Sequence, residues 1–127
     1  MSDPSQNQFD IRVTTAYIID QSRPTDEHYV FSYTVTIRNN GSVAARLISR
    51  HWIITDANGE VQEVFGEGVL GQQPFLQPGE DFSYTSGTTL PTPVGSMHGS
   101  YQMRTEQGAH FDAPIAPFSL ATPNTLH

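Results

Sequence analysis

The glycines of residues 66–71 are the arrangement in this chain that most directly suggests chemistry. Gly66, Gly68 and Gly71 fit the spacing G-x-G-x-x-G, in which backbone amides approach a phosphate. In a dinucleotide-binding fold such glycines lead into a helix, whose N-terminus attracts the anion. Here the motif runs into Pro74, and Glu67 places a carboxylate inside the cradle. The motif therefore favours a bulged or wrapped loop, with an anion-binding nest of backbone amides as the alternative.

Two of the five histidines could form a metal site across a hairpin. None of the five has the H-x-H or H-x-x-x-H spacing of a local metal site. His98 and His110 flank an expected turn at 106–108, so strand pairing could bring them to metal-ligand distance. Asp112 could then add an oxygen ligand. A divalent-metal site at His98 and His110 is one hypothesis, and isolated surface histidines are the other.

Side chains for covalent or acid–base catalysis are present without the arrangement that activates them. The chain has no cysteine, which excludes a thiolate nucleophile, and its serines do not form the G-x-S-x-G elbow. The carboxylate pairs Glu60/Glu63 and Glu80/Asp81 adjoin expected turns, where they are solvated rather than tuned for proton transfer. We therefore predict that the chain is not an enzyme, with no catalytic residues and no cofactor.

Length and charge narrow the classes of partner. A chain of 127 residues is long enough for one domain with its own core. The net charge is −7 and all six basic residues are arginines, which argues against nucleic-acid binding. Arg38, Arg46 and Arg50 either form one local basic spot or are scattered. The sequence has neither an apolar run of membrane-spanning length nor a secretory leader, so we expect a cytoplasmic protein without membrane insertion.

Alternation of apolar and polar residues dominates the chain, which is typical of half-buried antiparallel strands. Within 29–38, for example, the residues Phe31, Val35 and Ile37 share one face, and Thr34 and Thr36 take the other. Turn-forming residues at 39–41, 56–59 and 106–108 separate such runs. The pattern predicts seven strands, at residues 9–20, 29–38, 47–55, 60–65, 81–86, 96–105 and 109–118.

This succession of strands predicts an all-β fold. About seven strands with Trp52 in the third indicate an antiparallel two-sheet β-sandwich of the immunoglobulin or fibronectin type III kind. A closed barrel is the structural alternative. Pro114 and Pro117 predict that the last strand lies at a sheet edge or carries a bulge. We expect residues 9–120 to form the sandwich, and 1–8 and 121–127 to be disordered segments.

The glycine- and proline-rich stretch at 66–103 also carries a family resemblance. Its characteristic positions are Gly66-Glu67-Gly68-Val69-Leu70-Gly71, Pro74, Pro78-Gly79, Phe82, Tyr84, Ser86-Gly87, Pro93, Gly95, Met97, Gly99, Tyr101 and Met103. In these residues, and upstream at Arg50 and Trp52, the chain resembles the ApaG family of bacterial proteins. The resemblance covers most of residues 8–121.

The resemblance implies a fold and, less specifically, a role. ApaG-like domains have a fibronectin type III-like β-sandwich fold. The domain also occurs in eukaryotic F-box proteins and in a polymerase-interacting protein, which implies a protein-binding module. In bacteria the family is linked to cobalt tolerance and magnesium efflux, and the resemblance implies no enzymatic activity.

The apolar residues of the loop at 66–76 have two interpretations. They could plug the end of the sandwich, or some of them could form an exposed patch for a partner. Open sheet edges offer a second route, through strand addition. We interpret the chain as a non-catalytic interaction module for an unknown protein, acting as a monomer or weak dimer. The alternative is a small-ligand module for a nucleotide phosphate or a divalent metal. The expected contact residues are Arg50, Val69, Leu70, Phe75, Tyr84 and Tyr101.

Overall fold

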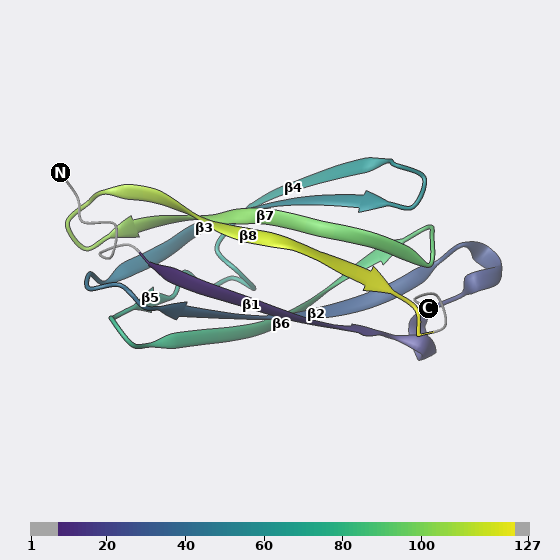
Figure 1. The fold of residues 1–127 in the computed structure, drawn as a ribbon, viewed down its shortest axis with the longest axis horizontal. Coiled ribbons are helices and arrows are strands. Elements are labelled where there is room, and N and C mark those ends of the chain that lie inside the picture. Colours follow the sequence, from purple (N-terminus) through teal and green to yellow (C-terminus); the bar gives the residue numbers. More distant parts are fainter. Residues whose placement is uncertain (1–7, 124–127) are drawn as a thin grey trace.

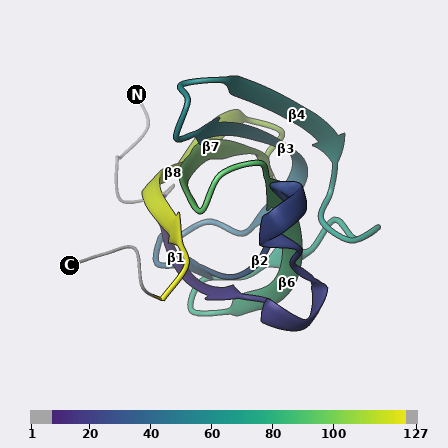
Figure 2. The same cartoon turned by 90° about the vertical axis from the view of Figure 1, so that its right-hand side faces the viewer.

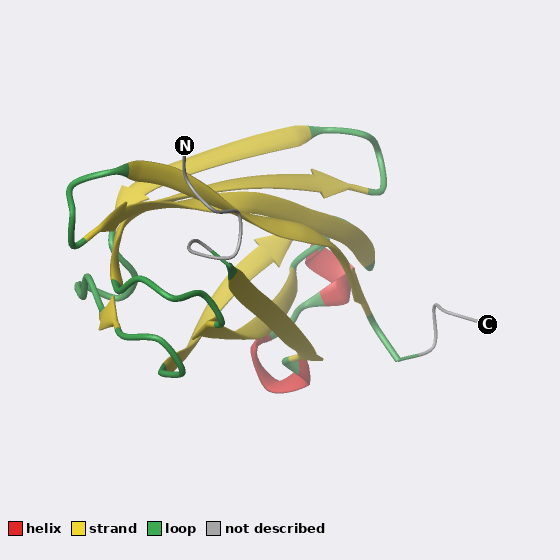
Figure 3. Cartoon of the chain, turned by 60° about the vertical axis from the view of Figure 1, so that its left-hand side comes forward, coloured by secondary structure: helices red, strands yellow, loops and turns green. Residues whose placement is uncertain are grey.

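Eight β-strands build the part of the chain that the computed structural model describes, residues 8–123 (Figure 1). Two short 3-10 turns, Ile19–Gln21 and Pro24–Asp26, follow the first strand and are seen in red in Figure 3. All seven expected strands are present, and the two-residue β5 is the additional one. The strands are β1 (Phe9–Tyr17), β2 (Tyr29–Asn39), β3 (Ala45–Asp56), β4 (Val61–Glu67), β5 (Phe75–Leu76), β6 (Asp81–Leu90), β7 (Val94–Thr105) and β8 (His110–Ala121).

The strands form two antiparallel sheets that face each other, as the end-on view shows (Figure 2). One sheet has the order β1-β2-β6, and the other has the order β4-β3-β7-β8, with β5 pairing to β3. This confirms the predicted β-sandwich. Residues 1–7 and 124–127, which make up most of the two segments expected to be disordered, lie outside the described residues.

The core lies between the sheets and follows the alternation of the sequence. On β2, Phe31, Val35 and Ile37 are buried because every second side chain points to the same face of a strand. Trp52 is also buried and packs edge-on against Tyr33 from the opposite sheet, with ring centroids 5.3 Å apart. Such aromatic contacts add to the free energy gained by apolar burial.

A buried asparagine organises the turn after β2. The Asn39 side chain is fully buried, and its amide nitrogen donates to the carbonyl oxygens of Val43 and Leu76 at 2.9 and 3.0 Å. Its Oδ1 accepts a hydrogen bond from the Gly41 amide at 2.9 Å. A buried polar group without a hydrogen-bond partner would destabilise the fold. These hydrogen bonds satisfy the Asn39 side chain and connect the end of β2 to β5.

The two sheets are in contact along one side of the sandwich and leave a cavity along the other. On the joined side, the rings of Phe9 on β1 and Phe111 on β8 lie 5.8 Å apart. On the open side lie β4 and β6, which are edge strands of their sheets. Residues of both strands line a cavity of about 280 Å³. Trp52 lines this cavity, together with Gln62 of β4 and Ser86 of β6.

The prolines of the last strand lie where the sequence predicts an edge or a bulge. β8 is an edge strand, and its pairing with β7 shifts register between Met97 and Gly99. Pro114 pairs opposite Ser100 in an otherwise continuous strand. Proline removes a ladder donor, so an edge position and a local bulge both accommodate it.

The 3-10 turns within residues 8–123 are short. No helix there has the length and apolar character needed to cross a bilayer.

Candidate functional site

Exposed apolar side chains gather on residues 61–75, which comprise β4, the loop that follows and the start of β5. We call this stretch the 61–75 segment. Of the five large apolar side chains exposed within residues 8–123, four lie on it, and Ile19 is the fifth. Exposed apolar residues that cluster mark interaction surfaces more often than scattered ones do. The four side chains are Val61, Phe65, Leu70 and Phe75.

The first glycine of the G-x-G-x-x-G motif makes room for an arginine. Gly66 pairs with Arg50 across β3 and β4, and a Cβ at Gly66 would lie 2.6 Å from the Arg50 guanidinium carbon. The guanidinium crosses this gap and donates to the carbonyl oxygens of Glu67 and Gly68 at 3.0 and 2.8 Å. The motif therefore presents carbonyl groups to a cation that belongs to the protein itself.

The other two glycines shape a tight hairpin after β4. Val69 and Gln72 exchange two backbone hydrogen bonds of 2.8 and 2.9 Å around a two-residue tip. At this tip Leu70 and Gly71 have φ angles of 49° and 76°, so both are left-handed, as a type I′ turn requires. Gly68 is also left-handed, with φ at 62°. The glycine spacing thus serves a turn, for which glycine is the least strained residue.

This geometry leaves few amides for a phosphate. The Gly68 amide donates to the carbonyl oxygen of Ile48, and the amides of Val69 and Gln72 bond each other's carbonyl oxygens. The motif also leads into a hairpin rather than into a helix, so it lacks the helix N-terminus that attracts anions. Gly66, Gly68 and Gly71 therefore shape the backbone of a tight hairpin and the space for Arg50, without a bulge in the β3–β4 pairing.

The apolar residues of the loop divide between core and surface. Val69 and Leu76 are 1% and 5% exposed and belong to the core, which agrees with the plug interpretation. Leu70 and Phe75 are 62% and 37% exposed. Val69 therefore has to be removed from the expected contact surface, whereas Leu70 and Phe75 remain on it.

Phe75 lies beneath the side chain of Arg46. The Arg46 guanidinium is 5.2 Å from the centre of the Phe75 ring, which is a cation–π contact. The same guanidinium donates to the carbonyl oxygen of Gln73 at 2.7 Å. The Arg46 side chain of β3 therefore holds the exposed Phe75 ring in place.

Tyr84 and Tyr101 lie in the core, not on the expected surface. Tyr84 of β6 and Tyr101 of β7 are 7% and 0% exposed, and their hydroxyl groups hydrogen-bond across the two sheets at 2.5 Å. Burial raises the pKa of Tyr84 to about 12, and burial also raises the pKa of Tyr101. Both hydroxyls stay protonated at neutral pH, so the pair connects the sheets and offers a partner no accessible group.

The two histidines of the expected metal pair lie far apart. His98 pairs with Ile53 on β3, whereas His110 pairs with Arg104 on β7. Arg104 lies six residue steps from His98 along β7, which is about 20 Å at the rise of a strand. The expected pair is therefore not formed. Within residues 8–123, no three His, Cys, Asp or Glu side chains gather closely enough to hold a metal ion.

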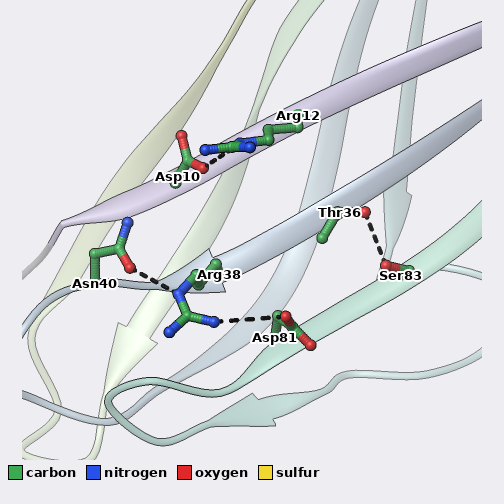
Figure 4. Close-up of polar contacts among 7 residues, drawn as sticks. All are labelled: Asp10, Arg12, Thr36, Arg38, Asn40, Asp81 and Ser83. Atoms are coloured by element: carbon green, nitrogen blue, oxygen red, sulfur yellow. Dashed lines mark hydrogen bonds and ion pairs between the residues drawn. The ribbon is translucent and has the colours of Figure 1, made fainter.

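The three neighbouring arginines do not form one basic spot. Arg38 belongs to the other sheet, where it donates to Asn40 at 3.0 Å and pairs with Asp81 at 3.6 Å (Figure 4). Arg46 and Arg50 lie on β3 and bond the loop that follows β4. The scattered interpretation of these arginines holds, since their contacts are local and separate.

Val61 and Phe65 are exposed apolar residues that the sequence pattern did not indicate as surface residues. Phe65 is 69% exposed, and its ring stacks on that of His51 at 3.9 Å between centroids. Glu63, between the two apolar residues, lies 3.6 Å from the same histidine. Alternation indicates that these residues share one face of a strand, but it does not indicate which face meets solvent.

Comparisons with known proteins identify the family. A sequence model of the ApaG domain matches residues 19–105. Protein ApaG of Azoarcus sp. is 57% identical and Protein ApaG of Ectopseudomonas mendocina is 59% identical, each over the full length of both chains. The crystal structure of an ApaA protein from Bordetella pertussis is 54% identical, with a TM-score of 0.92 over 96% of this chain and 100% of that one. The chain therefore belongs to the ApaG family.

Proposed function

We propose that this ApaG-family chain is a non-catalytic protein-interaction module, with the exposed side of the loop at 66–76 as its contact surface. Leu70 and Phe75 are the central contacts, and Arg46 and Arg50 hold the loop in shape. The proposal includes a cytoplasmic site of action and a monomer or weak dimer. Because the expected His98/His110 pair is not formed, we propose that any link to cobalt tolerance or magnesium efflux runs through the protein partner.

The backbone and exposure of Leu70 carry this proposal. Leucine at φ 49° costs about 1 kcal/mol relative to glycine in the left-handed region. Its side chain is 62% exposed, so burial within the chain does not offset that cost. Asparagine or glycine would form the same turn with less strain. A strained, solvated leucine at a hairpin tip fits a role in which the side chain is buried by another molecule.

The experiment is the substitution Leu70→Asn, which keeps the left-handed turn and removes the apolar side chain. We expect the melting temperature to hold or rise slightly, because asparagine tolerates this backbone conformation. Recovery of the bound protein from a lysate of the source cells should fall about tenfold, as for removal of a hot-spot residue. Quantitative mass spectrometry of immobilised parent and variant would measure both the identity and the amount of the captured protein.

Ile19→Asn is the matched control. Ile19 is also exposed and apolar, but it lies in the turn between β1 and β2, away from the glycine-rich loop. This variant should capture the same protein as the parent. If Leu70→Asn is folded and captures its partner as the parent does, the loop is not the contact surface.

A further inference from the structure

The four edge strands of the sandwich differ in how they are protected from pairing with another chain. On β1, Asp10 accepts a hydrogen bond from Arg12 at 2.8 Å, and this exposed ion pair guards the edge (Figure 4). On β8, Pro114 and Pro117 remove backbone donors. The outer face of β6 is polar, and its Ser83 hydrogen-bonds to Thr36 of β2, so this edge has no exposed apolar side chains for a partner strand to cover. β4 combines an open edge with exposed apolar side chains.

Hydrogen bonds at both ends of β4 define which backbone groups are free. The Asp56 amide donates to the Glu60 carbonyl at 3.0 Å, and the Gly68 amide donates to the Ile48 carbonyl at 2.8 Å. Bonded and non-bonded pairs alternate in an antiparallel ladder, so the even-numbered residues between these ends face β3. The odd-numbered residues direct their N–H and C=O groups to the free edge: Val61, Glu63, Phe65 and Glu67.

The same residues carry the side chains that an added strand would meet. Val61 and Phe65 are exposed and apolar, and Glu63 lies between them. In an antiparallel pair, directly opposed residues share a face, so an incoming strand would place apolar residues opposite Val61 and Phe65. A cationic residue would match Glu63. The carbonyl of Glu67 already accepts from Arg50, which leaves residues 61–65 as the main pairing region.

The acidic charge of the chain determines which kind of partner strand the β4 edge attracts. The chain has a net charge of −7, and the outer face of β4 contributes Glu63 and Glu67. A second copy would bring the same acidic edge, so its approach is opposed by repulsion. A partner with alternating apolar and basic residues is attracted to the edge and also covers the exposed apolar side chains.

The open side of the sandwich accommodates the other face of such a strand. Residues of the incoming strand that lie opposite Gln62 and Val64 would point inward, toward the cavity of about 280 Å³ between β4 and β6. Its lining includes Ser86 and Thr88 of β6 as well as these two residues of β4. Threonine is suited to these positions, because it combines a methyl group with a hydroxyl and favours strands.

We propose that the free edge of β4 binds an extended segment of a partner protein by strand addition. The bound segment alternates apolar and basic residues on its outer face, with Lys or Arg opposite Glu63. This inference goes beyond the proposed function, since it involves neither Leu70 nor Phe75. The edge and the glycine-rich loop are consecutive in the chain, so one partner can contact both.

The test uses a fluorescein-labelled peptide of sequence Val-Thr-Lys-Thr-Val-Thr-Lys, with anisotropy and amide-resolved NMR as readouts. We expect saturable binding that weakens with salt. Amide shifts and slower hydrogen exchange should centre on Val61, Glu63 and Phe65. A peptide with Glu in place of Lys should bind more weakly, and one with N-methylated backbone amides should not bind. Shifts centred away from β4 would overturn the proposal.

Substitutions of Glu63 separate the backbone and charge contributions. Glu63→Gln removes the carboxylate alone, whereas Glu63→Pro also removes a backbone donor that faces the free edge and spares the β3–β4 ladder. Glu63→Pro should weaken peptide binding about fivefold to tenfold, and more than Glu63→Gln does. Glu63→Lys should invert the preference, favouring the glutamate peptide by about fivefold. If Glu63→Pro binds the lysine peptide as the parent does, strand addition is overturned, and if Glu63→Lys does so, the inferred basic character of the partner is overturned.

Leu70→Asn separates this inference from the proposed function, because it should leave peptide binding unchanged. If that variant keeps its cellular partner, the loop proposal alone is overturned. Analytical sedimentation of the unaltered chain tests whether a second copy of the chain occupies the β4 edge. If concentration alone produces a dimer with shifted amides on β4, the edge pairs with a second copy, and the inferred basic partner is wrong.

Discussion

The apolar residues at 69–76, in the loop after β4 and in β5, form two sets that differ in their exposure to solvent. Val69 and Leu76 are buried between the sheets, whereas Leu70 and Phe75 are exposed. Val69 and Leu70 are consecutive, yet the left-handed backbone at Leu70 turns the chain back toward Gln72. Similar side chains therefore have different roles: one set holds the loop to the sandwich, and the other is presented to solvent.

The residues that hold this loop in place are therefore distinct from the residues that it presents to solvent. Burial of the inner residues and the contacts of Arg50 fix its path, so the outer residues contribute little to folding. Loops positioned by a rigid scaffold are a common place for binding residues. Four changes of sequence or pH test this distinction and the packing around it, in order of decreasing change in the free energy of unfolding.

Replacement of Leu76 by alanine should cost the most. Leu76 is 5% exposed, and Leu→Ala in a core lowers the free energy of unfolding by about 3 kcal/mol. Phe75→Ala, one residue earlier and on the exposed side, should cost less than about 1 kcal/mol. Urea unfolding of the two variants measures the difference. Equal costs would contradict the division between inner and outer residues.

Alkaline pH should weaken the buried tyrosine pair. Burial raises the pKa of Tyr84 to about 12, whereas tyrosine in an unfolded chain titrates near about pH 10. Between these values the unfolded chain binds fewer protons than the folded one, so the free energy of unfolding falls as pH rises. The stability is complete below pH 10 and declines by about 2 to 3 kcal/mol toward pH 12. Urea unfolding across this range provides the measurement.

The control for this pH effect is the variant that carries both Tyr84→Phe and Tyr101→Phe. It lacks the two titrating hydroxyls of the pair, so its alkaline decline should be smaller than that of the parent. The same decline in both proteins would show that other groups cause it.

Gly66→Ala should have an intermediate cost. The new methyl group would meet the Arg50 guanidinium at 2.6 Å and displace it from the carbonyl oxygens of Glu67 and Gly68. We expect a loss of about 1.5 kcal/mol, in line with two exposed or half-buried hydrogen bonds. In an Arg50→Ala background the same change should cost less, which a double-mutant cycle measures. Additive effects would mean that Gly66 has another role.

Phe65→Thr should change stability least. Phe65 is exposed on the edge strand, and threonine also favours strands, so we expect a change within about 0.5 kcal/mol by thermal unfolding. Most of that change reflects the lost stacking on His51. A loss comparable to that of Leu76→Ala would place Phe65 among the residues that hold the fold.

Much of the fold could be predicted because its signals are local. Alternation on β2 and the turn at Asn39 depend on neighbours in sequence, and both match the structure. The prolines of β8 likewise predicted an edge or a bulge. The candidate site was harder to predict. The spacing of Gly66, Gly68 and Gly71 is the same for a phosphate cradle and for a hairpin with room for an arginine.

The class of fold, the strands and the family can be established from the amino-acid sequence, because they depend on periodicity, turn residues and characteristic positions along the chain. The three-dimensional packing sets which residues are accessible. It buried Tyr84 and Tyr101 in a contact between sheets and set His98 and His110 apart through strand register. It also left β4 as an open edge. These outcomes depend on pairing and packing between residues distant in sequence, which no local pattern specifies.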